Sequence, residues 1–273
     1  TSGVLKLAGA RLDARGVTIS GPAIDVSIAD LATRQSSGLL RATSIASGTN
    51  ALDDVALKFE RIGPLTLLDL AGKFDGAPLT LAGSVEPRED AVALNLDAFT
   101  AAPRKIPVKL AAPTTILVRD GAALIDKLVI AAGDGTIAVD GSAGKVLNLD
   151  VKIAALPASL ANAFAKDLEA EGTLSATATV KGNAAAPVAT FAANLTGAST
   201  SRTRAQGLEN LDVAAKGQFA NNVLNADIAT TLKGQPAQAA IEVRLTGGTL
   251  KVPTIKLSVG KTVVTGNLAL DAT

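Results

Sequence analysis

Five residue types are absent from this 273-residue sequence: histidine, cysteine, methionine, tryptophan and tyrosine. Without histidine there is no imidazole for acid–base catalysis or for metal binding. Without cysteine there is no thiol nucleophile, no thiolate zinc site and no disulfide bond. Six phenylalanines are the only aromatic side chains, so a core filled by large rings is not expected. Because the chain begins with Thr1, we expect it to be a piece of a longer chain or a processed one.

Net charge and long apolar runs are also scarce. The 26 basic and 25 acidic side chains leave a net charge of +1, which argues against a nucleic-acid partner. No uncharged apolar stretch reaches about 18 residues, so no transmembrane helix is expected. Residues 1–9 lack the apolar core of a signal peptide. We therefore expect any export signal or membrane anchor to lie outside this sequence, and we expect no cofactor and no bound metal.

The sequence does contain a regular alternation of apolar and polar residues. Every second residue is apolar from Val55 to Phe59, and the same pattern holds from Leu149 to Ile153. Successive strand side chains point to opposite faces, so each segment has one apolar and one polar face. Half-buried strands of this kind belong in antiparallel sheets rather than in the buried parallel sheets of α/β proteins. The alternation therefore predicts an all-β fold with an antiparallel-rich sheet.

Turn signals separate the alternating segments. Asp75-Gly76, Asp120-Gly121, Asn221-Asn222 and Gly247-Gly248 favour hairpin turns because these residues tolerate positive φ. Strand–turn units of about ten residues predict roughly 20 strands. So many strands must stack into sandwiches, close into a barrel, coil into a solenoid, or form one long sheet folded along its length. The scarcity of aromatic residues favours the long folded sheet, with an aliphatic interior.

One segment departs from the alternation. Residues 157–168 are rich in helix formers and carry Pro157 at a first-turn position. The apolar residues that recur at helical spacing are Leu156, Leu160, Phe164 (with Ala163) and Leu168. We predict a short amphipathic helix. The expected parts of one elongated unit are then a β segment over 1–155, a helical connection over 156–170 and a β segment over 171–273.

If the sheet folds along its length, the apolar residues of the alternating strands line its interior, where each faces either an open groove or a closed core. The predicted lining residues are Val55, Leu57, Phe59, Val92, Leu94, Leu96, Leu149, Val151, Ile153, Val180, Ile241, Val243, Leu245, Ile255, Leu257 and Val259. An aliphatic lining suits acyl chains, which need no hydrogen bonds. Polar groups at the rim would keep a lipid headgroup in water.

Motifs that would indicate catalysis are weak. Gly133-Asp-Gly135 precedes a strand-like pattern, whereas a dinucleotide fingerprint must open a helix. Gly260-Lys261-Thr262 lacks the earlier glycine of a phosphate-binding loop, since position 255 is Ile255. No two carboxylates are spaced to indicate a glycosidase pair. Arg202 and Arg204 lie in a small basic segment that we expect to be solvated. We predict that the protein is not an enzyme.

The segment from Leu156 to Leu174 and the strand after it resemble a passage found in one family. The most specific residues are Glu171-Gly172-Thr173-Leu174, followed by an alternating strand, Gly182 and Pro187. The stretch from Ile116 to Gly141 is similar in its strand–turn pattern. On these residues the chain resembles the translocation-and-assembly-module proteins (TamB) and their AsmA-like relatives.

The resemblance implies a long β-sheet folded into a U-shaped trough, or β-taco, with an aliphatic interior. Proteins of this family are anchored in the inner membrane of Gram-negative bacteria and cross the periplasm to an outer-membrane barrel of the TamA type. They are implicated in phospholipid movement between the membranes and in outer-membrane protein assembly. We therefore expect a periplasmic, lipid-conducting groove, with phospholipid acyl chains and such a barrel as partners. The alternative is a structural or adhesive β-solenoid or sandwich with no lipid ligand.

Overall fold

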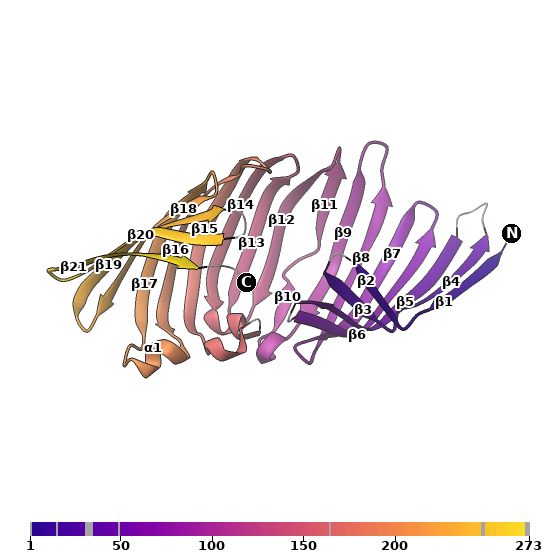
Figure 1. The fold of residues 1–273 in the computed structure, drawn as a ribbon. Helices are drawn as coiled ribbons and strands as arrows, with labels where there is room; N and C mark the ends of the chain where they lie inside the picture. The colour runs from indigo at the N-terminus through magenta and orange to yellow at the C-terminus, as the bar shows by residue number, and fades with distance from the viewer. Residues whose placement is uncertain are drawn as a thin grey trace. The chain divides into compact units, whose positions relative to one another are not determined.

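The computed structural model describes residues 2–14, 16–30, 35–48, 50–163, 165–246 and 249–270. Strands make up 76% of the structure and helices 6%, so the predicted all-β, antiparallel fold is confirmed. The described residues contain 21 strands, close to the 20 that the turn spacing predicts. They form two compact units, residues 1–133 and 134–273, whose strands are coloured along the chain in Figure 1. The boundary after Gly133 differs from the predicted division at 156–170, which lies inside the second unit.

Unit 1 is an antiparallel arrangement of twelve strands with one 3-10 turn. Its elements are β1 (Gly3–Ala8), β2 (Arg11–Ala14), β3 (Val17–Ser20), β4 (Ala23–Asp30), β5 (Gln35–Ser47), β6 (Asn50–Ile62), β7 (Leu65–Phe74), β8 (Ala77–Pro87), β9 (Val92–Ala101), η1 (Pro103–Lys105), β10 (Val108–Leu110), β11 (Thr114–Arg119) and β12 (Ala122–Ala132). The run from β5 to β9 is a meander in which each strand pairs with the next.

Two strand positions of unit 1 are interrupted. At its start, β1 pairs with β4 and β2 pairs with β3, so the first hairpin is divided midway, where the Gly9 amide donates to the Pro22 carbonyl at 2.8 Å. At its other end, β9 pairs with both β10 and β11, and these two short strands both pair with β12. Pro113 lies in the break between β10 and β11, where its lack of an amide hydrogen prevents a continuous ladder.

Unit 2 is a meander in which every strand is antiparallel to the next. Its elements are β13 (Gly135–Ala143), β14 (Val146–Pro157), η2 (Ala158–Ala163), η3 (Lys166–Leu168), β15 (Glu171–Asn183), β16 (Val188–Ser199), α1 (Ser201–Ala205), β17 (Leu211–Ala220), β18 (Val223–Leu232), β19 (Gln235–Thr246), β20 (Thr249–Val259) and β21 (Thr262–Leu270). Figure 1 shows the strand direction turning strongly between β13 and β21, as expected for a twisted antiparallel sheet.

The predicted hairpin turns form where the sequence places them. Asp75-Gly76, Asp120-Gly121 and Asn221-Asn222 each connect consecutive strands, and both residues of each pair have positive φ. This geometry matches the right-handed twist of the flanking strands and requires residues that tolerate left-handed backbone conformations. Gly247-Gly248 lies outside the described residues.

Bulges bend several strands of unit 2 near the strand ends from which η2, η3 and α1 continue. The register shifts between β14 and β15 at Ala155, between β15 and β16 at Gly172, and between β16 and β17 at Gly197. All three residues have positive φ, with values of 49°, 112° and 64° respectively. A bulge adds one residue to one strand and increases its local bend. These neighbouring strands therefore change direction close to the segments η2, η3 and α1.

The predicted helix over 157–168 is wrong in type, although the segment does leave the sheet. Pro157 ends β14, and residues 158–163 and 166–168 form two separate 3-10 turns instead of one α-helix. The helical path stops because Ala165 has φ −134° and ψ 84°. Leu168 is 38% exposed, so this member of the expected apolar stripe is not packed. Phe164 lies outside the described residues.

Candidate functional site

The alternating residues of unit 2 place continuous apolar rows on one face of its sheet, which we call the apolar face of unit 2. Strand register brings each member of a row opposite the next. One row is Val139, Val151, Ala178, Phe191, Gly217, Ala226, Ile241 and Ile255. A parallel row is Ile137, Ile153, Ala176, Ala193, Ala215, Ile228, Ala239 and Leu257. Neither row contains a polar side chain.

Unit 1 has an equivalent surface, which we call the apolar face of unit 1. Its most regular row is Ile24, Leu40, Leu57, Leu70, Leu81 and Phe99. The next row is Val26, Gly38, Phe59, Leu68, Gly83 and Leu96. The following row is mixed, because Ser36, Arg61 and Thr66 lie opposite one another in it, whereas Val85 lies opposite Leu94. The apolar face of unit 1 is therefore interrupted by polar side chains on β5, β6 and β7.

The structure brings the predicted lining residues together within each unit. Those on the apolar face of unit 1 are Val55, Leu57, Phe59, Val92, Leu94 and Leu96. Those on the apolar face of unit 2 are Leu149, Val151, Ile153, Val180, Ile241, Val243, Ile255, Leu257 and Val259. The side chain of Leu245 lies outside the described part of the structure. Leu70, Leu81 and Phe191 were missed, because their flanking apolar neighbours or small residues obscure the alternation.

The apolar faces are covered only in part. Val55 is buried, Leu257 is 38% exposed, and the other described lining residues lie between these extremes. Among the described residues the buried apolar side chains are alanines and two valines, and no large side chain is fully enclosed. Most of the described lining residues are half-buried, so part of each aliphatic face is open to solvent.

Polar side chains occupy the opposite, outer face and in unit 1 bond to one another. Thr80 and Thr100 share a hydrogen bond of 2.6 Å across β8 and β9. The Asn95 amide donates to Ser84 Oγ at 3.0 Å and accepts from Thr115 Oγ1 at 2.7 Å. These cross-strand contacts hold the strands in register. Each of these five side chains takes part in at least one of the hydrogen bonds.

The shifted pKa values belong to exposed ion pairs of unit 1. Hydrogen bonds from Arg11 and from Thr18 lower the pKa of Asp13, and the hydrogen bond to Asp13 raises the pKa of Arg11. The hydrogen bond with Asp54 raises the pKa of Lys73, across an ion pair of 2.8 Å. All of these groups are exposed to solvent. The hydrogen bonds that shift their pKa values join local pairs, and none of these groups is an acid or base on the apolar faces.

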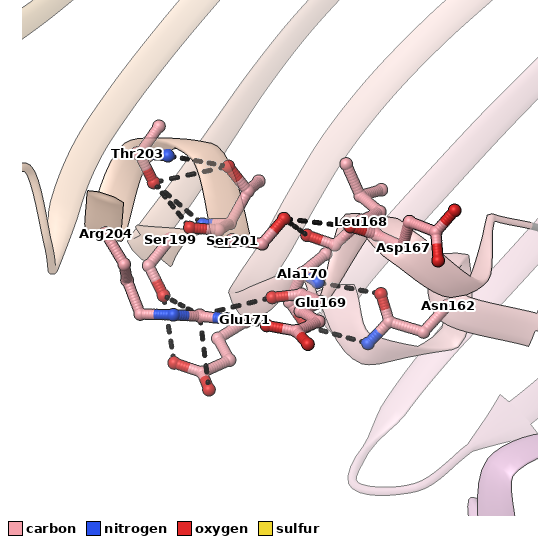
Figure 2. Close-up of polar contacts among 11 residues, drawn as sticks. Asn162, Asp167, Leu168, Glu169, Ala170, Glu171, Ser199, Ser201, Thr203 and Arg204 are labelled. Carbon is pink, nitrogen blue, oxygen red and sulfur yellow. Dashed lines mark hydrogen bonds and ion pairs between the residues drawn. The ribbon is translucent and has the colours of Figure 1, made fainter. Parts of the chain in front are cut away.

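A polar cluster fastens the helical segments at one edge of unit 2, as Figure 2 shows. Arg204 Nη2 donates to Glu169 Oε2 at 2.7 Å, and Arg204 Nη1 donates to Ser199 Oγ at 3.1 Å and to the Glu169 carbonyl at 3.2 Å. Ser199 Oγ in turn donates to Glu171 Oε2 at 2.9 Å. The side chain of Arg204 is only 27% exposed, so the expectation that it is simply solvated is wrong. We call these four residues the Arg204 cluster.

Two further contacts support the Arg204 cluster. Ser201 Oγ donates to the Asp167 carbonyl at 2.8 Å, which joins the start of α1 to η3. The Asn162 side chain accepts from the Ala170 amide at 2.7 Å and donates to the Ala170 carbonyl at 3.1 Å, which joins η2 to the start of β15. The connections β14–β15 and β16–β17 are thereby tied together, as Figure 2 illustrates. The Arg204 cluster joins residues about 35 positions apart in the sequence, which explains why local sequence patterns did not indicate it.

The described residues contain no group of three or more acidic side chains placed to hold a metal ion. Within the same residues, no helix is long and apolar enough to cross a membrane. The two glycine motifs lie in turns, as the sequence predicts: Gly133 connects β12 and β13, and Gly260 connects β20 and β21. Neither precedes a helix that could bind phosphate.

Comparisons with known proteins do not assign the chain to a family. No protein-family model matches it, and neither curated proteins nor solved structures contain a match. Function is therefore inferred from the geometry of the two apolar faces and from the resemblance described above.

Proposed function

We propose that the apolar face of each unit accepts acyl chains, and that the protein conducts phospholipid across the periplasm as a member of the TamB and AsmA-like family. In this proposal the sheet is folded into a U-shaped trough, and an anchor outside this sequence fixes the protein to the inner membrane. An outer-membrane barrel of the TamA type receives the other end. Such a bridge would be linked to outer-membrane protein assembly.

The observation that supports this proposal best is the size and composition of the apolar face of unit 2. Its two rows extend over eight strands, or about 34 Å, and over about 14 Å along each strand, giving roughly 480 Å². The largest apolar patch on a soluble monomer is usually about 300–600 Å² and is often functional. The rows consist of Ala, Val, Ile, Leu and Phe, together with Gly217, and contain no charged residue. A flexible apolar ligand would cover this surface without requiring a hydrogen bond.

Lipid extraction and native mass spectrometry of the purified protein test the proposal. We expect copurifying phospholipid in the wild-type protein and its loss in Val151→Glu, which places a charge in the middle of the apolar face of unit 2. The matched control is Lys152→Glu, because Lys152 lies on the opposite face of the same strand and is exposed. Ala193→Phe is a second variant that fills the face while keeping it apolar, and it should also reduce bound lipid.

Circular dichroism shows whether each variant retains its β-sheet. A folded wild-type protein that contains no phospholipid and takes up none from added vesicles would contradict the proposal. That result would favour the alternative of a structural or adhesive β-protein. If Val151→Glu unfolds the chain, the amount of phospholipid bound by Ala193→Phe tests the proposal instead, because this variant adds no buried charge.

A further inference from the structure

One hydroxyl group on the apolar face of unit 2 has no partner within the described part of the protein. Among the described residues, Thr230 Oγ1 is the one enclosed side-chain polar atom that lacks a hydrogen bond. Thr230 lies on β18, two residues beyond Ile228 of the apolar row that also contains Ile153. An enclosed, unpaired hydroxyl lowers stability, and valine would have nearly the same shape without this cost. The presence of threonine here therefore calls for a physical reason.

Strand register places Thr230 in a third row of the same face. The members of the third row are Leu156, Leu174, Leu195, Val213, Thr230, Ala237, Val259 and Thr262. Thr262 ends the row on β21 and is exposed. From β14 to β20, Thr230 is therefore the one polar side chain among the described members of this row.

The third row lies at the margin of the apolar face. Beyond it the strands reach the edge that carries η2, η3 and α1, and β18 ends there in a turn with the exposed Lys233. On the far side of the two rows described above, a fourth row is again apolar, with the members Leu149, Val180, Ala189, Phe219, Leu224 and Val243. The Thr230 hydroxyl is therefore at one end of the apolar rows, next to a polar edge.

The hydroxyl of Thr230 can reach a ligand that lies on this face. Thr230 as a whole is half-buried although its Oγ1 atom is enclosed, so other atoms of the residue contact solvent. Rotation about χ1 exchanges Oγ1 with the other substituents of Cβ, and two χ1 rotamers are common in strands. A rotamer other than the enclosed one therefore presents the hydroxyl as a donor to the open face.

The surroundings of Thr230 select the kind of group that it can bind. The flanking side chains of Val213 and Ala237 offer no donor or acceptor, so a ligand with several polar groups would leave most of them unpaired. An acyl chain that ends in an ester brings one carbonyl acceptor, which matches one hydroxyl donor. The four rows extend about 20 Å along the strands, whereas one leaflet of a bilayer has a hydrocarbon depth of about 15 Å. An acyl chain that begins at Thr230 therefore fits along the strands.

We propose that Thr230 donates a hydrogen bond to an ester carbonyl of a bound glycerophospholipid and thereby sets the direction of the lipid. The acyl chain runs along the strands from the third row to the fourth. The headgroup lies at the edge that carries α1 and the β18–β19 turn, where the ammonium group of Lys233 is on the same side as the phosphate. This role of Thr230 rests on the proposed acyl-chain function, to which it adds a positioning residue and a direction.

Competition between two lipids that differ only in their linkage tests the hydrogen bond. Vesicles contain equal amounts of ester-linked phosphatidylethanolamine and of its ether-linked analogue, which has the same chains and headgroup but no carbonyl. Native mass spectrometry of the incubated protein gives the ratio of the two bound lipids. We expect the wild-type protein to favour the ester lipid about fivefold and Thr230→Val to bind both lipids equally. Thr230→Ser retains the hydroxyl and should retain the preference.

Thr262→Val is the matched control, because Thr262 belongs to the third row and is exposed but lies three strands away on β21. This variant should keep the wild-type preference. Equal binding of the two lipids by the wild-type protein, a preference that survives in Thr230→Val, or a preference that Thr262→Val also abolishes would overturn the role of Thr230 and leave the acyl-chain function standing. A folded wild-type protein that binds neither lipid would contradict the acyl-chain function itself.

Cross-linking tests the direction of the lipid. A phospholipid with a photoreactive headgroup should label residues 200–210 and 232–235, which lie at the edge that carries α1. Residues 184–187 and 221–222 form turns at the opposite ends of the same strands and should remain unlabelled. Labelling of these turns in place of the α1 edge would show that the lipid lies in the reverse direction, and the proposed contact with Thr230 would be wrong.

Discussion

The ring of Phe191 lies across Gly217 on the neighbouring strand of unit 2. The two residues are cross-strand partners in the middle of the apolar face. A Cβ atom built on Gly217 would approach the ring atoms Cε1 and Cζ of Phe191 to 2.7 Å and would also collide with the Asn225 carbonyl. Phe59 and Gly38 show the same relationship in unit 1. In both units an aromatic ring therefore lies along the sheet over a glycine, which covers exposed backbone and keeps the face shallow.

Gly217→Ala should destabilise the protein. The new methyl group must displace both the Phe191 ring and the β18 backbone at Asn225, and such overpacking costs about 1–3 kcal/mol. The free energy of unfolding from urea denaturation measures this loss. Gly266→Ala is the matched control, because Gly266 lies in the same row opposite Ile255 and a methyl group added there would meet no atom within 4 Å.

The control substitution should leave stability unchanged or raise it slightly, since alanine restricts the unfolded chain more than glycine does. Equal losses in Gly217→Ala and Gly266→Ala would show that the Phe191 contact is not responsible. The corresponding change in unit 1, Gly38→Ala, should behave like Gly217→Ala.

The sequence predicted the strands and their two faces because period-two alternation is a local property. Val151 and Ile153 can be assigned to one face from five consecutive residues, without knowledge of their neighbours in the sheet. The turns at Asp75-Gly76 and Asn221-Asn222 were equally local, since their residue types favour positive φ. The turns therefore form at the predicted residues, whereas the alternating segments cover only part of their strands: Val55–Phe59, for example, lies inside the longer β6.

Register and long-range contacts could not be predicted in the same way. The bulge at Ala155 requires positive φ at a residue that rarely adopts it, so no residue-type signal marks it. The bond from Arg204 to Glu169 joins residues 35 positions apart. The 3-10 turns over 158–163 and 166–168 replaced the predicted α-helix because contacts with Ala170 and Ser201 fix the chain there. Tertiary contacts outweighed local propensity at these positions.

Thr230→Val should stabilise unit 2. Thr230 lies between Val213 and Ala237 in an apolar row, and its Oγ1 atom is enclosed without a hydrogen-bond partner among the described residues. Burying an unpaired hydroxyl costs about 1–3 kcal/mol in proteins, so the isosteric valine should raise the free energy of unfolding by about 1 kcal/mol. Thermal and urea denaturation measure the change.

The control for Thr230 is Thr190→Val on the outer face. Thr190 shares a 2.8 Å hydrogen bond with Thr179, and its loss should leave stability unchanged or lower it by up to about 1 kcal/mol. A loss of stability in Thr230→Val would indicate that the hydroxyl does have a hydrogen-bond partner, such as a water molecule, in solution.

Thr18→Val should raise the pKa of Asp13. This pKa lies below its ordinary value of 3.8 because Arg11, and to a smaller extent Thr18, donate hydrogen bonds to the carboxylate. The folded pKa is lowered, so the contribution of Asp13 to stability is present above pH 3.8 and is lost as the pH falls through the folded value. Carboxyl carbon shifts followed by NMR during titration measure the change. Thr18→Ser retains the donor and should leave the pKa where it is.

Arg204→Ala should loosen the edge of unit 2 that carries η2, η3 and α1. The substitution removes every hydrogen bond from the guanidinium to Glu169 and Ser199, together with the 3.5 Å ion pair to Glu171. Because the carboxylates of Glu169 and Glu171 are largely exposed, we expect a loss of only about 1–2 kcal/mol. Hydrogen exchange should accelerate at the amides of Arg204 and Gly207, while the centre of β15 and β16 stays protected.

Two further variants separate the geometry of Arg204 from its charge. Arg202→Ala removes an exposed arginine of the same helix that makes none of the contacts drawn in Figure 2, so it should leave exchange at this edge unchanged. Arg204→Lys keeps the charge but loses the planar, forked donor group that reaches Glu169 and Ser199 together, so exchange should lie between wild type and Arg204→Ala. If Arg202→Ala accelerates exchange as much as Arg204→Ala does, loss of positive charge near α1 is the cause and the hydrogen bonds of the Arg204 cluster are not.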